Sequence, residues 1–214
     1  MPCSPVRRID IAYHLLDGEN LASVQKHGLL STERLVLQAG DVDPGLLRVF
    51  RSTGQRLSSG VRIRDQSPMP PQALARALDG GLRPEDWYAL LNSKVFFWLD
   101  AERLNRQRAA CGAAPQLALV IDAQKMLNDR HQLAFVSPIN TGNARRAPAM
   151  RNRSTFVPYQ RWVMDAWAHE VIGGQRTRPA SHRAVELTID GSVPNVFEYV
   201  LETIPLPLGA KLTS

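Results

Sequence analysis

The sequence has little of several features that define common protein classes. It holds only two cysteines, Cys3 and Cys111, in 214 residues, so it carries neither a disulfide framework nor the paired cysteines of a zinc site. Its five histidines are scattered and form no HExxH motif, and we therefore expect no built-in metal site. No apolar run approaches the roughly 20 residues that cross a bilayer, and the first residues lack the apolar core of a secretory signal. These absences predict a cytoplasmic chain with no membrane segment.

Motifs that bind nucleotides in other folds are also missing. The sequence contains neither the GxGxxG fingerprint nor a P-loop, which disfavours a Rossmann oxidoreductase or a nucleoside triphosphatase. Its composition, 44% hydrophobic and 21% charged, is that of an ordinary globular protein. No internal repeat or clear linker divides the chain, so we expect a single domain over residues 1–214.

The positive charge is concentrated in one segment. The whole chain has a formal net charge of +6, and residues 145–183 alone hold eight arginines against Asp165 and Glu170, which also gives +6. Arginine without lysine suits bidentate contacts to phosphate, although the arginine bias of a GC-rich genome would produce the same composition. The nucleic-acid contacts expected from this segment are Arg151, Arg153 and Arg161, with Tyr159, Trp162 and Trp167 as stacking surfaces.

A carboxylate lies in the middle of a predicted strand in the last part of the chain. Alternation of Val185, Leu187 and Ile189 predicts a half-buried strand over residues 182–190 and places Glu186 on its other face. A mid-strand carboxylate beside a basic segment suits a cleft in which an acid orients or polarises a substrate. An edge-strand glutamate that faces water has the same pattern, so both interpretations stay open.

The chain opens with a strand and a helix. Residues 9–16 predict a short strand that carries Tyr13 and His14, and a histidine on such a strand is more often a core or capping residue than a ligand. The next helix, over residues 20–27, ends at Gly28, which occupies the usual position of a helix-terminating glycine. A second helix is expected over residues 31–39, capped by Ser31 or Thr32, and a third from Pro44 toward Arg56.

The most apolar run, VFFWL at residues 95–99, predicts a buried central strand. Alternation directs Phe96 and Trp98 to one face and Phe97 to the other, so only one face could touch a ligand. Strands at 116–122 and 131–138 follow, and the second leads into a turn-rich loop that contains Asn140. Residues 65–91, which lie between Arg64 and the strand at 95–99, are predicted to form a helical insertion.

The order of these features resembles the DarT-type DNA ADP-ribosyltransferases. The opening YHLLDGENLASVQKHGLLS is similar to that family's first strand with its histidine and the following NL..I...GL helix. SKVFFWLDAERL has the layout of the family's VPFYF strand and the turn after it, and AVEL at 184–187, with VP at 193–194, corresponds to its AEFL and VP. The resemblance runs from Tyr13 to about Ile204, and the 65–91 segment departs from it.

This resemblance implies a mixed α/β (α+β) fold with two packed mixed sheets around an NAD cleft and flanking helices. It implies that NAD is the substrate, that Glu186 and Arg64 are catalytic, and that a nucleic acid accepts the ADP-ribose in a toxin-type reaction countered by a cognate antitoxin. The cofactor-binding residues that it implies are His14, Tyr13, Phe97, Arg103 and Asn140. Either Arg64 or Arg103 would bind the phosphates of NAD.

Two other functional classes stay open from the sequence. The basic segment alone would support a nucleic-acid or protein-binding module without catalysis. An NAD glycohydrolase, which uses water as the acceptor, would need the same cleft but no macromolecular target.

Overall fold

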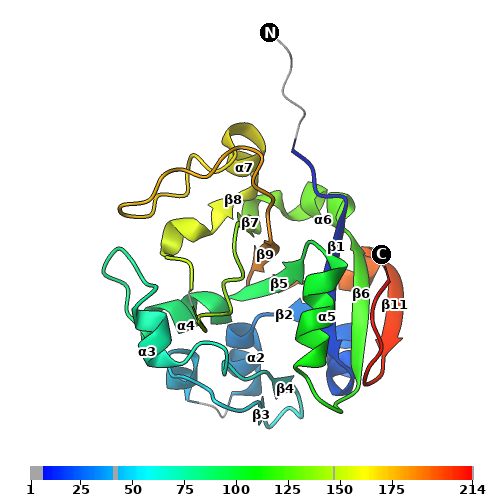
Figure 1. Ribbon diagram of the computed structural model, residues 1–214. Coiled ribbons are helices and arrows are strands. Elements are labelled where there is room, and N and C mark those ends of the chain that lie inside the picture. Colours follow the sequence, from blue (N-terminus) through cyan, green and yellow to red (C-terminus); the bar gives the residue numbers. More distant parts are fainter. Residues whose placement is uncertain (1–6, 41–42, 147, 214) are drawn as a thin grey trace.

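Seven of the strands form one large sheet that crosses the molecule (Figure 1). The computed structural model describes residues 7–40, 43–146 and 148–213, so Cys3 lies outside the described residues. The strand order is β11-β6-β1-β5-β9-β7-β8, and neighbouring strands pair antiparallel throughout. The bounds are β1 Ile11–Asp17, β5 Lys94–Trp98, β6 Gln116–Asp122, β7 Ala134–Ser137, β8 Val157–Pro158, β9 Glu186–Asp190 and β11 Val200–Leu206.

Short strands and helices flank this sheet. Two small pairs join β2 (Leu29–Leu30) to β10 (Ser192–Val193) and β3 (Gln55–Arg56) to β4 (Arg62–Ile63). The helices are α1 Leu21–His27, α2 Thr32–Ala39, α3 Pro71–Ala75, α4 Pro84–Asn92, α5 Ala101–Ala109, α6 Ala123–Arg130 and α7 Tyr159–Asp165. Short 3₁₀ helices cover Gly18–Asn20, Pro44–Leu47, His131–Leu133, Arg153–Thr155 and Val196–Glu198. Within the described ranges, none of the helices has the length and apolar character needed to span a membrane.

The two halves of the large sheet meet at a narrow junction. Strands β1 and β5 share a single registered pair, Tyr13↔Trp98, whereas β1 pairs with β6 along its whole length, from Ile11↔Asp122 to Asp17↔Gln116. The mixed α/β class is confirmed, but one large antiparallel sheet and two small antiparallel strand pairs stand in place of the expected two packed mixed sheets. A strand joined to its neighbour at one position is free to diverge on either side of it, so the halves β11-β6-β1 and β5-β9-β7-β8 stay linked yet distinct.

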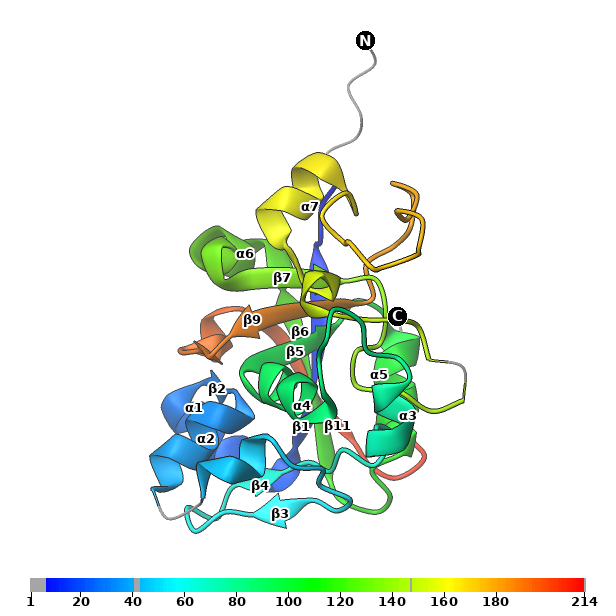
Figure 2. The same cartoon turned by 90° about the vertical axis from the view of Figure 1, so that its left-hand side faces the viewer.

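One face of the sheet carries the main hydrophobic core. Alternation directs Phe97 of β5 to this face together with Leu187 and Ile189 of β9, and all three are buried. Burial of each such side chain contributes about 2 kcal/mol. The covering helices add Val24 from α1, Met126 from α6 and Trp162 from α7. In Figure 2, α1 and α6 lie on one side of the sheet and α5 lies on the other.

The opposite face carries two separate clusters. Helix α5 packs Leu104 against Leu15 of β1, while α4 packs Trp87 and Tyr88 in a cluster that reaches Phe96 of β5. The helical character predicted for residues 65–91 is therefore confirmed, and α4 buries its apolar side against the second half of the sheet. The junction of β1 and β5 lies between the regions that the two helices cover.

The helix predicted from Pro44 toward Arg56 is wrong beyond its first turn. A 3₁₀ helix spans Pro44–Leu47, and the chain then leaves the helical path. Arg51 turns inward, where its guanidinium donates to Asn92 Oδ1 (3.0 Å) and its backbone N–H donates to Gln66 Oε1 (3.1 Å). The hydrogen bond to Gln66 satisfies a buried backbone N–H that a continued helix would have paired locally.

Gly28 is the glycine on which the packing of this fold depends most directly. It ends α1 with φ +75°, and a Cβ atom built on it would lie 2.3 Å from the carbonyl oxygen of Val193. Gly40 ends α2 with φ +77°, and among the described residues beyond its chain neighbours and its own helix backbone no atom comes within 4 Å of the same position. We expect Gly28→Ala to destabilise the protein by roughly 3 kcal/mol or more and Gly40→Ala by about 1 kcal/mol. Thermal unfolding of both variants measures this, and equal losses would contradict the close approach at Gly28.

Candidate functional site

Glu186 begins strand β9 in the interior of the sheet. The strand lies between β5 and β7, where Glu186 is registered with Trp98 on one side and Ser137 on the other. Its side chain shares a face with Trp98 and Thr188 and is 3% exposed. The glutamate therefore does not face water from an edge strand, which removes one of the two interpretations of the sequence.

The loop after β7 folds back over the Glu186 carboxylate. The chain turns directly after Ser137, whose Oγ donates to the Ile139 carbonyl (3.0 Å). This turn places the Thr141 N–H 3.2 Å from both carboxylate oxygens and the Thr141 Oγ1 2.7 Å from Oε2. A loop that leaves β7 opposite Glu186 thus returns to donate hydrogen bonds to the side chain of its own cross-strand neighbour.

Burial dominates the electrostatics of this carboxylate. It raises the pKa of Glu186 from an ordinary value of 4.5 to about 7, against the opposing effect of the Thr141 hydrogen bonds and of the charges on Arg151 and Arg103. The side chain is therefore poised to change its charge near neutral pH, as acid–base and electrostatic catalysts are.

Arg151 lies inside the protein and not on a nucleic-acid-binding surface. Its side chain is 1% exposed, and its Nη1 donates to the Thr141 carbonyl at 3.0 Å. Burial lowers the pKa of Arg151 to about 10, while the charge of Glu186 acts in the opposite direction. The prediction that Arg151 contacts nucleic acid is wrong because a buried guanidinium cannot reach a phosphate at the surface.

Aromatic side chains line the same face as Glu186. Trp98 is half-buried and donates from Nε1 to Gln107 Oε1 at 2.8 Å, and Tyr13 is its registered partner on β1. Phe97 points the other way and is 1% exposed in the main core. The resemblance implied a cofactor contact for Phe97, and this is corrected: Phe97 faces the main core, whereas Trp98 and its partner Tyr13 lie on the Glu186 face.

His14, on β1, forms a side-chain contact with β5 next to the single registered pair of the two strands. Its Nδ1 donates to the Phe96 carbonyl at 2.9 Å, and its ring lies 5.6 Å from that of Phe97. Alternation along β1 places His14 on the side opposite to Tyr13, and burial lowers the pKa of His14 to about 4. The histidine is therefore neutral at physiological pH and joins the two halves of the sheet.

The two arginines predicted to contact NAD phosphates lie in different places. Arg64 donates to Cys111 Sγ (2.8 Å) and to Gln116 Oε1, at the end of β1 away from Glu186. Arg103, in the first turns of α5, pairs with Asp100 at 2.7 Å. The charge of Arg103 acts on the pKa of Glu186. Of these two arginines, Arg103 is therefore the one whose charge acts on Glu186, as that of Arg151 also does.

Asn140 directly precedes Thr141 in the loop over Glu186 and is half-buried. Its backbone therefore adjoins the residue that donates to the Glu186 carboxylate, and its contact with a cofactor stays a prediction. A surface hollow of about 740 Å³ lies elsewhere, between α6 and α7, and the predicted cofactor-binding residues do not line it. In the described part of the chain, no three His, Cys, Asp or Glu side chains converge to form a metal site.

Most arginines of the basic segment are exposed. Within the described residues, those that are exposed and form no ion pair are Arg145, Arg146, Arg153, Arg161, Arg176 and Arg183. Arg178 differs, because it pairs with the buried Glu170 at 2.7 Å. Trp162 and Trp167 are 6% and 0% exposed. Both belong to the main core, so the prediction that they stack on bases is wrong.

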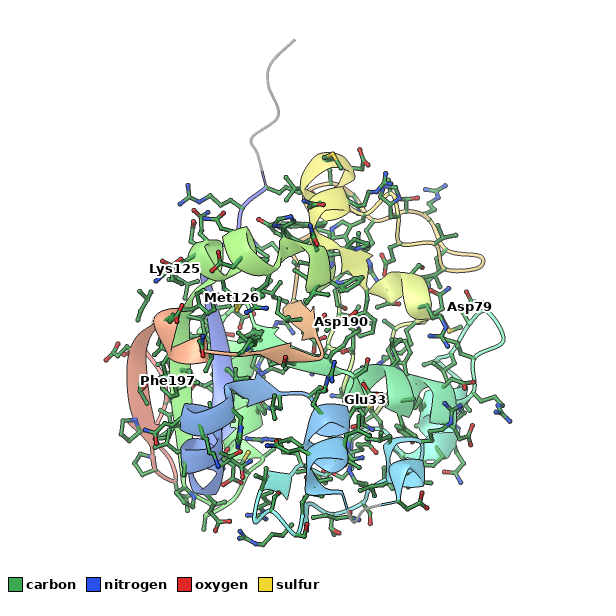
Figure 3. The ribbon with its side chains drawn as sticks, turned by 180° about the vertical axis from the view of Figure 1, so that it is seen from behind. Glu33, Asp79, Lys125, Met126, Asp190 and Phe197 are labelled. Atoms are coloured by element: carbon green, nitrogen blue, oxygen red, sulfur yellow. The ribbon has the colours of Figure 1, made fainter. Side chains whose placement is uncertain are left out.

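Hydrogen bonds hold the basic segment, residues 145–183, against the rest of the protein. Asp79, labelled in Figure 3, accepts hydrogen bonds from the Gly173 N–H (2.8 Å) and from Asn152 Nδ2 (3.0 Å). Farther along, Trp167 Nε1 donates to the His182 carbonyl (2.8 Å) and His182 Nε2 donates to the Pro138 carbonyl (3.1 Å). The segment therefore ends beside the loop that covers Glu186.

Sequence reasoning missed Thr141 and Trp87 as parts of this site. Thr141 lies in a turn-rich stretch, where a hydroxyl residue is common. Its position four residues after the end of a strand is the one sequence feature that would allow the chain to fold back over the neighbouring strand. Trp87 lies on a helix in the segment read as an insertion, so its hydrogen bond to the Thr141 carbonyl (3.3 Å) has no local signal.

The raised pKa of Glu186 predicts a stability that falls as pH rises. Because the folded protein holds this proton more tightly than the unfolded chain, stability is lost between pH 4.5 and about 7, by roughly 3 kcal/mol at most. Glu186→Gln, which cannot ionise, should therefore melt higher than the native protein at pH 8 and close to it at pH 5. Thermal unfolding across this range measures the difference, with exposed Glu202→Gln as the control. A constant difference would show that Glu186 does not titrate there.

Comparison with known proteins places these residues within one family. No curated protein matches the chain. The model of a family of unknown function, DUF7002, matches residues 10–200, a range that contains Tyr13, Trp98, Thr141 and Glu186. Since this match covers most of the 214 residues, the chain belongs to the DUF7002 family.

Proposed function

We propose that the protein is an NAD-dependent ADP-ribosyltransferase that modifies nucleic acid. The observation that carries the proposal is the Glu186 carboxylate, buried on an interior strand, held by Thr141, and close enough to Arg103 for the two charges to interact. Tyr13 and Trp98 on the same face supply aromatic surface for a flat ring. The resemblance to DarT-type enzymes in the order of strands and motifs adds support to this assignment.

The proposed reaction needs few groups from the protein. The bond between nicotinamide and the ribose C1′ breaks, nicotinamide leaves with the electron pair, and positive charge develops at C1′. An ionised Glu186 would stabilise that charge and orient the attacking group, which bonds to C1′ and loses its proton. Arg103 would neutralise pyrophosphate, because a guanidinium forms paired hydrogen bonds with phosphate oxygens.

The acceptor is assigned from the exposed arginines of the basic segment. Their side chains lack carboxylate partners among the described residues and belong to a segment that ends beside the Glu186 loop. Unpaired arginines on one segment favour a polyanion over a neutral acceptor, since each can displace counterions from a phosphate.

A binding module without catalysis is the second candidate. The 3% exposure of Glu186 favours it, because a carboxylate so enclosed could act only as a structural partner of the Thr141 loop. In this case the exposed arginines would still hold nucleic acid, but NAD would have no role.

Incubation with NAD distinguishes the two candidates. At about 100 times its dissociation constant, NAD should stabilise the folded state by about 2.7 kcal/mol and raise the melting temperature. Mass spectrometry of oligonucleotides and proteins from the same reaction should show an added ADP-ribose. Glu186→Gln should retain the NAD-dependent shift but lose roughly 100-fold or more in turnover, because it removes the charge opposite C1′.

Glu202→Gln, on the exposed strand β11, is the matched control and should turn over normally. No melting shift at millimolar NAD would reject the enzyme and favour the binding module. Release of nicotinamide without any modified macromolecule would instead identify an NAD glycohydrolase.

Salt dependence tests the assigned acceptor surface. Replacing an arginine that contacts phosphate should reduce the slope of log affinity against log salt by roughly 0.7 for single strands or 0.9 for duplex DNA. We expect this for Arg153→Ala, Arg176→Ala and Arg183→Ala, and no change for Arg34→Ala, which removes an exposed arginine from helix α2. Oligonucleotide binding measured over a salt series gives the slopes. Slopes that stay flat or unchanged in the first three variants would place the acceptor among proteins or small molecules.

A further inference from the structure

The hydrogen bonds to Glu186 come from one residue. Within the described residues, the donors to its carboxylate are the N–H and the Oγ1–H of Thr141, and together they reach both oxygens. Two donors from one residue restrict the orientation of the carboxylate, so this orientation depends on where the Thr141 peptide lies.

The position of Thr141 is itself fixed by two buried donors. Its carbonyl accepts from Arg151 Nη1 at 3.0 Å and from Trp87 Nε1 at 3.3 Å, and both donor side chains are almost completely enclosed. Arg151 is held in turn, because its Nε donates to the Ala149 carbonyl (3.0 Å) and its backbone N–H to the Ala77 carbonyl (2.8 Å). A continuous set of hydrogen bonds therefore connects the segment around Ala77 to the carboxylate.

We propose that Thr141 is the positioning residue of this site and that Arg151 acts on Glu186 through it. This inference rests on the proposed function, in which Glu186 is the catalytic carboxylate. Arg151 would then be an internal brace that holds the Thr141 peptide, and not a ligand for substrate.

The electrostatic balance agrees with this geometry. Burial raises the pKa of Glu186, and the two Thr141 hydrogen bonds are the largest influences that lower it, ahead of the charges of Arg151 and Arg103. Those arginines are the charged groups that act on Glu186, Arg151 from just before the 3₁₀ helix Arg153–Thr155 and Arg103 from α5. Without Thr141 the carboxylate would be protonated at neutral pH and could not stabilise a ribosyl cation.

The first test removes the Thr141 hydroxyl with little change of shape. In Thr141→Val the pKa of Glu186 should rise by about one, a tenfold change in its acid dissociation constant, whereas Thr141→Ser keeps the donor and should titrate like the native protein. The infrared band of the protonated carboxyl group, assigned by its absence in Glu186→Gln, follows this titration without NAD. Thr141→Ala provides the same comparison if the valine variant does not fold.

The second test asks how Arg151 acts. Arg151→Met should also raise the pKa of Glu186, and Arg151→Lys should restore part of it because a lysine can still donate to the Thr141 carbonyl. If Arg151 acts through Thr141, the effect of Arg151→Met should shrink in the Thr141→Val background. If it acts only by its charge, the two changes should add, and this part of the proposal is overturned.

Activity then separates the inference from the proposed function. Thr141→Val should reduce turnover and move its pH profile upward with the pKa of Glu186, while the NAD concentration at half-maximal rate changes little. If the native protein transfers no ADP-ribose, the proposed function fails but the infrared titrations still decide whether Thr141 positions Glu186. A titration unchanged in Thr141→Val, or equally displaced in Thr141→Ser, overturns the assignment of Thr141.

Discussion

A buried negative charge is the constraint on which this part of the structure depends. A carboxylate enclosed in the middle of a sheet loses its hydration, and it stays ionisable only where donors or positive charges replace the lost water. Here the replacement comes from Thr141 directly and from Arg151 and Arg103 at longer range. The course of the loop after β7 and the inward direction of Arg151 both meet this requirement. The conformation of this loop, which has no regular secondary structure, is therefore held by specific hydrogen bonds, as the strands beside it are.

Local periodicity predicted much of the fold. Alternation along residues 95–99 placed Phe97 opposite to Phe96 and Trp98, and alternation around Val185 placed Glu186 on the face away from Leu187, and the structure has both arrangements. Ser31 caps α2 as expected, accepting a hydrogen bond from the Arg34 N–H. These features depend on contacts between residues close in sequence, where the geometry of a strand or helix end leaves few choices.

What the sequence could not show depends on contacts between distant residues. Composition marks Arg151 and Arg153 as equivalent members of a basic segment, yet one is 1% exposed and the other lies on the surface. The difference arises because residue 151 forms a bridge to Leu78 and donates to Thr141, and neither contact has a sequence signal. Trp162 was assigned to a ligand surface by the same reasoning about composition, and it lies in the core.

The junction of β1 and β5 explains why His14 and Tyr13, adjacent in sequence, have different roles. Two strands that stay registered would carry both residues in continuous layers above and below the sheet. Because β1 and β5 share only the pair Tyr13↔Trp98, the strands part beyond it, and His14 bonds to the Phe96 carbonyl that a continuous ladder would have engaged. Tyr13 keeps the register and so stays on the Glu186 face. The order of motifs in a sequence can mark such a strand, but only the register of that strand decides which of its residues share a face with Glu186.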